Sequence, residues 1–526
     1  MKRTKTAVSI VALLSIALLS YPAGAKQPKQ ITLTPIGRFN AGPGIERAEI
    51  PAYDPVTTRI FSINPTLLRV DVLDISDPTG PALAFTIPLG GRPNSVAIHD
   101  GVVAVAIENA IKTDPGFVQF FDTDGTLLST VTVGALPDML IFTPNGRRLL
   151  VANEGEPNDA YNIDPEGSVS IIDMTVGPAN LTQADVRNVT FNDSIPTTNA
   201  SSIRVYGLGA MLAQDLEPEY IAVSNNSKTA WITLQENNAI AVLDIEAGVF
   251  TRLVGLGFKD HNQGGNGLDA SDQDGGINIA DWPIFGIYQP DAIESYRFRG
   301  ATYLVMVNEG DTRSFTGFNE EVRVSSDSYV LDPATFTNAA VLKQNTNLGR
   351  LTVTNATGDT DGDGDFDQIL VPGGRSFSIR TASGNLVFDS GDDFERLTAA
   401  QVPEAFNSNG TAATFDTRSD NKGPEPEGVV LGKAFGRTYA FIGLERTAGI
   451  MVYDVSNPFS PSFVQYMNTA PDDISPEGLL FIKAEDSPNG KPLLVVSHEI
   501  SSTTTIFEIN QEQHNTNLVA RAFSRH

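Results

Sequence analysis

The residues best suited to chemistry in this chain are the five aspartates of DTDGDGDFD, which runs from Asp359 to Asp367. Carboxylates packed this closely repel one another unless a cation lies among them. Asp359, Asp361, Asp363, Asp365 and Asp367 match positions 1, 3, 5, 7 and 9 of a calcium loop, with Gly364 at the sharp turn of position 6. Leu370 stands at position 12, where a helix-loop-helix site has a bidentate glutamate. The stretch therefore predicts the Asp/Gly-rich calcium loop of a secreted structural module, and a solvated acidic turn is the alternative.

A second acidic stretch, GNGLDASDQDGGINI, could also supply oxygen ligands to calcium through Asp269, Asp272 and Asp274. Small turn-forming residues separate these aspartates, so a plain polar turn is the alternative interpretation. Other chemistry lacks its motif. None of the five histidines pair at a zinc-site spacing, and no G-x-S-x-G stretch occurs. We therefore assign no nucleophile and no general base.

The composition and the N-terminal residues predict an acidic, secreted protein. Lys2, Arg3 and Lys5 precede an apolar run that ends at Ala23-Gly24-Ala25, which is typical of a signal peptide spanning residues 1–25. A short membrane anchor is the alternative. Cleavage after Ala25 would remove three positive charges and change the formal net charge from −27 to −30. Without cysteine the chain can form no disulfide, and its charge disfavours nucleic acid and attracts cations. No second apolar segment follows, so we expect release to the periplasm or the medium without stable membrane insertion.

A repeated pair of strands organises the rest of the chain. An apolar strand ending in an acidic residue recurs as VDVLD, VQFFD, VSIID, IAVLD, SYVLD, IMVYD and TTIFE, and another apolar strand precedes each copy. The shorter spacings suit a propeller blade of about 40–50 residues. We predict an all-β, seven-bladed β-propeller of residues 26–526 with an inserted loop at 257–288. A small α/β insertion at 336–423 would hold the calcium-type loop.

The repeats also predict an acidic mouth. In an up-and-down blade, the start of the first strand and the end of the second lie on the same face. Acids at these two positions should therefore surround one end of the central channel. The predicted mouth residues are Glu46, Asp138, Glu154, Glu219, Glu236, Asp291, Glu309, Glu427, Glu445, Glu477 and Glu499. Solvated loop acids scattered by composition are the alternative.

Three further features concern this mouth and the closure of the ring. His498, beside Glu499, could be a mouth residue, with a buried structural histidine as the alternative. Arg313 could meet an anionic group there or form an internal ion pair. The stretch ITLTPIGRF (residues 31–39) resembles the outer strands ALAFTIPLG and LLSTVTVG, so we expect it to complete the last blade.

Several phrases together resemble one family of secreted bacterial proteins. They are VANEGEPNDAYNIDPEGSVSIID, LDASDQDGGINI, PIFGIYQPDAI, NEGDTR, SDNKGPEPEGVV and AFIGLERTAGIMVYDV. They resemble the choice-of-anchor I family, which is related to the mesenchyme-specific cell-surface glycoproteins of skeleton-forming animal cells. The resemblance implies a propeller of the quinoprotein-like or YVTN-like type. Some relatives carry alkaline phosphatase or phytase labels.

Two hypotheses for function follow. The first is a secreted, calcium-binding propeller that acts as a binding or surface-associated module. The second is a calcium-dependent phosphohydrolase in which ions at the mouth bind phosphate and activate water. The expected partner is an unidentified small anionic ligand or an extracellular partner, and the chain is expected to be a monomer. Phosphate release from an aryl phosphate or phytate would distinguish the two hypotheses.

Overall fold

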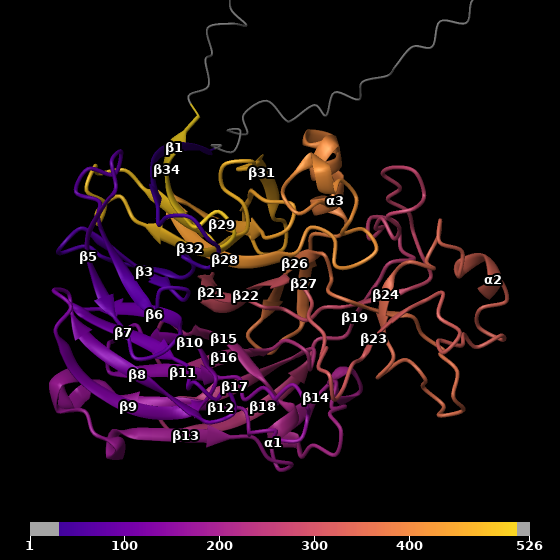
Figure 1. Cartoon of the computed structure of the whole chain (residues 1–526), viewed down its shortest axis with the longest axis horizontal. Coiled ribbons are helices and arrows are strands. Elements are labelled where there is room, and N and C mark those ends of the chain that lie inside the picture. The colour runs from indigo at the N-terminus through magenta and orange to yellow at the C-terminus, as the bar shows by residue number, and fades with distance from the viewer. Residues whose placement is uncertain (1–30, 513–526) are drawn as a thin grey trace, which may run out of the picture.

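The computed structural model describes residues 31–512, and its sheets follow one another along the chain (Figure 1). The predicted signal peptide and its cleavage site after Ala25 lie outside these residues. Each main sheet is antiparallel and is built from consecutive strands, with three exceptions: the fourth sheet adds a short parallel strand, the fifth is interrupted after its second strand, and the seventh takes its outer strand from the start of the described chain. The second strand of each sheet is buried on both faces, as in VVAVAI of residues 102–107, because a neighbouring sheet covers each side. This burial explains why the repeats read as continuous apolar runs.

The strands of the main sheets have the following bounds. The first sheet has β2 (Pro51–Asp54), β3 (Arg59–Asn64), β4 (Arg69–Asp74) and β5 (Ala82–Pro88). The second has β6 (Pro93–His99), β7 (Val102–Ile107), β8 (Pro115–Asp122) and β9 (Leu127–Ala135). The third has β10 (Pro137–Phe142), β11 (Arg148–Asn153), β12 (Ser168–Asp173) and β13 (Val186–Thr190). The fourth has β15 (Pro218–Val223), β16 (Thr229–Leu234), β17 (Ala239–Asp244), β18 (Val249–Gly255) and the short parallel β14 (Thr197–Thr198).

The remaining main sheets follow the same order. The fifth has β21 (Ile293–Phe298), β22 (Ala301–Asn308), β26 (Ser376–Thr381) and β27 (Leu386–Asp389). The sixth has β28 (Pro426–Ala434), β29 (Arg437–Leu444), β30 (Ile450–Asp454) and β31 (Ser462–Met467). The seventh has β32 (Pro476–Ile482), β33 (Leu493–His498), β34 (Thr503–Gln511) and, from the start of the described chain, β1 (Ile31–Asn40).

The first strands of these sheets lie side by side around one axis. They contact one another in the order β2, β6, β10, β15, β21, β28 and β32, and β32 also contacts β2. A separate apolar core fills each gap between neighbouring sheets, including the gap between the seventh sheet and the first, where Ile60 and Leu73 pack near Leu493 and Val495. This arrangement is a β-propeller.

Strand β1 joins the two ends of the described chain. It pairs antiparallel with β34 from Ile31 opposite Gln511 to Asn40 opposite Thr503, with one register shift between Pro35 and Gly37. Ile31 and Leu33 are buried and share a core with strands of the sixth and seventh sheets. The prediction that residues 31–39 complete the last sheet is therefore confirmed by the pairing.

The fifth sheet differs from the sequence prediction. Its third strand is β26, whereas SYVLD was predicted to fill that place, and Leu331 of that stretch forms only an isolated bridge with Phe366. The hairpin of β26 and β27 falls within residues 336–423, which the sequence predicts to be an insertion. The pattern misled because SYVLD is also an apolar stretch that ends in an acid, and its local sequence is that of a third strand.

The residues between β22 and β26 form a lobe with the segment 257–288, to one side of the propeller (Figure 1). Strand β19 (Phe258–Asp260) pairs with β20 (Phe285–Ile287), which in turn pairs with β25 (Leu370–Pro372). Strand β23 (Glu321–Arg323) pairs with β24 (Thr352–Thr354). Leu268 and Ile284 share one core with Tyr329, Leu348 and Ile369. Two segments that are distant in sequence therefore fold together, and the lobe carries the stretch DTDGDGDFD.

The helices of the described residues are short. The α-helices are α1 (Leu212–Asp215), α2 (Ala339–Leu342) and α3 (Asp393–Gln401). The 3-10 helices are η1 (Met174–Val176), η2 (Pro178–Asn180), η3 (Gln183–Asp185), η4 (Ala200–Ser202), η5 (Pro403–Ala405) and η6 (Ala412–Thr414). Within residues 31–512, none of these helices is long and apolar enough to cross a membrane.

Deleting residues 31–40 should lower the melting temperature and the solubility of the protein. The deletion removes a fully paired outer strand and two buried side chains, and it leaves the edge of β34 open to other chains. Thermal denaturation and size-exclusion chromatography would measure both effects. An intact melting temperature in the deletion variant would contradict a role for β1 in closing the ring.

Candidate functional site

In four of the main sheets, the acidic residue at the start of the first strand lies in a β-bulge. The pairing register shifts between Pro137 and Leu140 in the third sheet, and the fourth, sixth and seventh sheets shift at the same place after their prolines. A bulge turns a side chain away from the regular alternation of the strand. The residues placed in these bulges are Asp138, Glu219, Glu427 and Glu477. The proline of each pair is tolerated because it opens the strand.

The first sheet uses Glu49 at this position, and not the predicted Glu46. The Glu49 amide donates to the Ile63 carbonyl (3.4 Å), and the Ile63 amide donates to the Ile50 carbonyl (3.1 Å). The fifth sheet has the same pattern at Asp291, whose amide donates to the Val307 carbonyl (3.2 Å). Glu46 instead forms an ion pair with Arg92 at 2.8 Å. Sequence reasoning missed Glu49 because Ala48 precedes it where the other sheets have proline.

The ends of the second strands supply the rim of the site. Glu154, Glu445 and Glu499 each follow the residue that pairs with the opening proline of the first strand. In the fourth sheet Pro218 pairs with Leu234, so the equivalent residue is Gln235 and not the predicted Glu236. Glu236 lies one residue farther along the chain and is buried.

These two sets of residues meet at one cavity of about 410 Å³. Its ionisable lining consists of ten carboxylic acids and two basic side chains. The acids are Asp138, Glu154, Glu219, Asp291, Glu309, Asp311, Glu427, Glu445, Glu477 and Glu499, and the bases are Lys422 and Arg446. A second cavity of about 340 Å³ adds Glu49 and Arg92, and it shares Asp138, Asp291, Glu427, Glu477 and Glu499 with the first. The acidic surface is therefore continuous along the propeller axis.

The basic residues neutralise one side of the cavity. Lys422 forms ion pairs with Glu309 at 2.6 Å and with Glu425 at 3.3 Å, and Arg446 pairs with Glu445 at 2.9 Å. Although burial opposes it, the attraction of Lys422, Arg418 and Arg446 lowers the pKa of Glu425. The sequence contained no repeat signal for Lys422 or for Asp311, because both come from loops outside the strand pattern.

On the other side of the cavity, Glu154, Glu219 and Glu236 form no ion pair with a basic side chain of residues 31–512. The carboxylate oxygens of Glu154, Glu219 and Glu236 all lie within 4.8 Å of one another. Burial raises the pKa of each of these three groups well above its ordinary range, and repulsion between neighbouring acids adds to the shift. Protons or a cation must therefore offset the negative charge there.

The predicted calcium loop lies in the lobe and brings three of its five aspartates together. Carboxylate oxygens of Asp359, Asp361 and Asp367 lie within 4.8 Å of one another. Amides of the loop donate to several of these groups, such as that of Gly362 to Asp359 Oδ1 at 2.7 Å. The remaining two, Asp363 and Asp365, lie in the same exposed turn, where the Asp365 amide donates to Asp363 Oδ1 at 3.2 Å.

The second predicted set of aspartates is divided among protein partners. Asp269 is fully buried and accepts hydrogen bonds from the amides of Ser271 and Asn278. Asp272 forms a bidentate ion pair with Arg350 at 2.9 and 3.1 Å. Asp274 accepts a hydrogen bond from the Gly276 amide at 3.3 Å. These contacts give Asp269 and Asp272 structural roles in the lobe.

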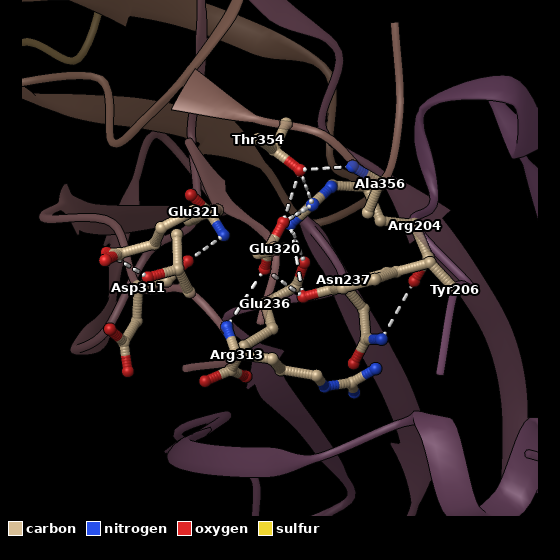
Figure 2. A network of polar contacts seen from close by, with 12 residues as sticks. Arg204, Tyr206, Glu236, Asn237, Asp311, Arg313, Glu320, Glu321, Thr354 and Ala356 are labelled. Atoms are coloured by element: carbon tan, nitrogen blue, oxygen red, sulfur yellow. Dashed lines mark hydrogen bonds and ion pairs between the residues drawn. The ribbon is translucent and has the colours of Figure 1, made fainter. Parts of the chain in front are cut away.

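Two residues predicted at the mouth are buried elsewhere. Arg313 pairs with Glu217 at 3.1 Å and with Asp215, and its guanidinium lies 4.5 Å from the ring of Tyr206. Figure 2 shows Arg313 and Tyr206 within one network of polar contacts. His498 is the last residue of β33 and pairs across the sheet with Pro476, so Glu499 reaches the cavity in its place. Burial lowers the pKa of His498 to about 4.

Most of the chain that carries this cavity matches one protein family. The profile described as the choice-of-anchor I domain matches residues 49–458. The chain belongs to the choice-of-anchor I family. The match covers the first five sheets with most of the sixth, together with the lobe.

Two curated animal proteins are similar to parts of this choice-of-anchor I chain. Gigasin-3a of Magallana gigas is 28% identical in an alignment of 184 residues, and the match covers 31% of this chain and 64% of the relative. The mesenchyme-specific cell surface glycoprotein of Strongylocentrotus purpuratus is 28% identical in an alignment of 277 residues, and the match covers 46% of this chain and 35% of the relative. The chain thus spans less than two thirds of the length of each relative.

One solved β-propeller structure is similar to this choice-of-anchor I chain at low sequence identity. The β-propeller domain of Cps50 (Swd1) from Myceliophteria thermophila is 10% identical, with a TM-score of 0.43, and the match covers 91% of this chain and 99% of that domain.

Burial of carboxyl groups at the mouth makes the stability of this choice-of-anchor I protein depend on pH. Burial raises the pKa of Glu49 to about 8, that of Asp138 to about 6 and that of Glu309 to about 7. A carboxyl group with a raised pKa binds its proton more tightly in the folded protein than in the unfolded chain. Its contribution to stability is therefore complete below its unfolded pKa and is lost as the pH rises through the folded pKa.

Replacing Glu49 with glutamine should flatten the pH dependence of the melting temperature in a chelating buffer. Glutamine cannot ionise, so the variant should melt above the native protein at about pH 8 and equally at about pH 5. Glu46→Gln is the matched control, because Glu46 lies close by in an ion pair with Arg92 and should give no gain at about pH 8. Identical pH profiles for the native protein and Glu49→Gln would contradict the buried, protonated state of Glu49.

Proposed function

We propose that this chain is a secreted or surface-associated, seven-bladed β-propeller module that binds calcium. The observation that carries the proposal is the cavity on the propeller axis, where ten carboxylic acids face two basic groups. Such a surface concentrates cations and repels anions. The closed series of contacts between the first strands supports the blade count, since each sheet contributes one strand to it.

An extracellular location is supported by the family and by the name of one relative, a cell surface glycoprotein. The proposed signal peptide agrees with this location. Because the chain has no cysteine, disulfide bonds cannot stabilise it outside the cell, and another kind of stabilisation must replace them. Bound calcium is one such means, because a ligand that binds only the folded state stabilises it.

The stretch DTDGDGDFD supports a second calcium site, in the lobe. Three of its carboxylates already have oxygens within 4.8 Å of one another, which suits a cation of calcium size. Repulsion from Asp363 raises the pKa of Asp361, although both side chains are exposed to solvent. Calcium would relieve this repulsion and hold the lobe's loop in one conformation.

Calcium should raise the melting temperature of the protein, and Asp361→Ala combined with Asp363→Ala should remove part of the rise. Free calcium at about 100 times its dissociation constant would stabilise the fold by about 2.7 kcal/mol. Differential scanning calorimetry with calcium and with a chelator would measure the effect. The matched control is Asp327→Ala with Glu404→Ala, which removes two exposed acids outside the loop. A melting temperature indifferent to calcium in the native protein would refute the proposal.

A calcium-dependent phosphohydrolase is the second candidate, because Lys422 and Arg446 line the same cavity and could contact a bound anion. We expect no phosphate release from an aryl phosphate or phytate in the presence of calcium, and weaker calcium binding by Glu427→Gln combined with Glu477→Gln. Both side chains face the cavity, so their loss reduces its negative charge. Hydrolysis by the native protein that is lost in the folded double variant would favour the enzyme instead.

A further inference from the structure

Two groups of three carboxylates lie near the mouth, and they differ in their partners. Glu309, Glu425 and Glu445 have oxygens within 4.8 Å of one another, but Lys422, Arg446 and Arg418 already form ion pairs with them. Glu154, Glu219 and Glu236 are equally close, and among residues 31–512 none of the three forms an ion pair with a basic side chain. The first group is already neutralised by the protein, whereas the second is not.

Glu236 provides a second and independent observation. Only 4% of its surface is exposed, and within the described part of the chain its Oε2 atom has no hydrogen-bond partner. Leaving a buried carboxylate oxygen without a partner is costly, because the oxygen has lost its water and gained nothing in exchange. Its carboxylate instead extends toward those of Glu154 and Glu219. This geometry is that of a ligand set.

The backbone that carries Glu236 is held firmly in place. Arg204 donates from its guanidinium to the Glu236 carbonyl at 2.8 Å, and the Arg204 amide donates to the Asn237 carbonyl at 2.8 Å. The side chain of Asn237 donates to the Asp215 carbonyl at 2.6 Å, and Arg204 is itself paired with Glu320 of the lobe (Figure 2). A ligand on so rigid a segment needs little reorganisation to bind an ion.

We propose that Glu154, Glu219 and Glu236 form a calcium site in the wall of the cavity, between the third and fourth sheets. Three carboxylates offer only oxygen ligands. Calcium prefers oxygen ligands, whereas zinc and copper are commonly bound by nitrogen and sulfur. Calcium binds oxygens at about 2.4 Å, so two ligands on opposite sides of the ion lie about 4.8 Å apart. Glu154 and Glu219 also line the cavity, which gives an ion and its remaining water ligands access.

This inference rests on the proposed function and assigns part of its calcium binding to three residues. The site is separate from the loop of Asp359 to Asp367, so an experiment can remove calcium binding at one site without removing it at the other. Calcium binding at the mouth would also connect the third and fourth sheets, since Glu154 follows β11, whereas Glu219 lies in β15 and Glu236 follows β16.

The test is isothermal titration of the purified, chelator-stripped chain with calcium chloride. The starting protein carries Asp361→Ala and Asp363→Ala, so the loop no longer contributes. We expect this protein to bind one calcium ion tightly, and the addition of Glu236→Gln to weaken that binding by at least about tenfold. Glu445→Gln is the matched control, because it removes the same charge from the same cavity at a residue already paired with Arg446. It should change the affinity less than about threefold.

Three outcomes would overturn the proposal. They are no calcium binding by the loop variant, no effect of Glu236→Gln, and equal losses for Glu236→Gln and Glu445→Gln, which would indicate diffuse attraction by the whole cavity. If the native protein binds calcium and the loop variant does not, this site is overturned and the proposed function is retained. If the native protein binds no calcium, both are overturned. If Glu236→Gln does not fold in the chelating buffer, Glu219→Gln on the partly exposed side replaces it. Loss of binding in that variant supports the site, and retention overturns it.

Discussion

The convergence of like charges on one axis is the constraint on which the rest of this structure depends. Closing the sheets into a ring brings the starts of all first strands together, and the bulges there turn acidic side chains toward the axis. Burying carboxylates in this way is unfavourable unless charge is offset. On one side of the cavity Lys422 and Arg446 offset it. On the other side the acids bind protons or, as we propose, calcium.

The lobe is joined to the propeller by charged groups that are buried rather than by apolar packing alone. Arg204, in the loop that precedes β15, pairs with Glu320. Arg375 pairs with Glu395 of α3 and also donates to the Asp269 carbonyl at 2.8 Å. Buried ion pairs add little net stability because of the cost of removing their water. They do restrict the partners that each charge can accept, so they favour a single docking geometry for the lobe. This geometry also holds the backbone of Glu236 behind the cavity.

Membership of the choice-of-anchor I family and the name of one relative, a cell surface glycoprotein, agree with a location outside the cell. The chemistry of the cavity is more informative. An apolar ligand finds little to contact on a surface formed mainly by carboxylates, and a free anion would be repelled by most of it. Cations, or anions carried by bound cations, fit this surface.

The sequence by itself determined the strand pattern, because a strand covered on both faces must be apolar throughout and must end in polar residues at the rim. VDVLD, IMVYD and TTIFE were correctly placed as third strands on this basis, and the N-terminal strand was matched to the outer strands by its pattern. The sequence also determined that acids recur at both strand ends. Local residue pattern carries this information because it reflects burial of the strand itself.

Only the tertiary structure decided which of these acids share a cavity and which have a partner. Glu49 takes the place of Glu46 at the start of a first strand, and Gln235 takes the place of Glu236 at the end of a second strand. Hydrogen-bond register, and not residue type, sets the direction of each side chain. The third strand of the fifth sheet, the common core of two distant insertions and the pairing of Arg313 with Asp215 and Glu217 depend on contacts across long sequence separations. Such contacts leave no periodic trace in the chain, because each is made once and its partners lie in different elements.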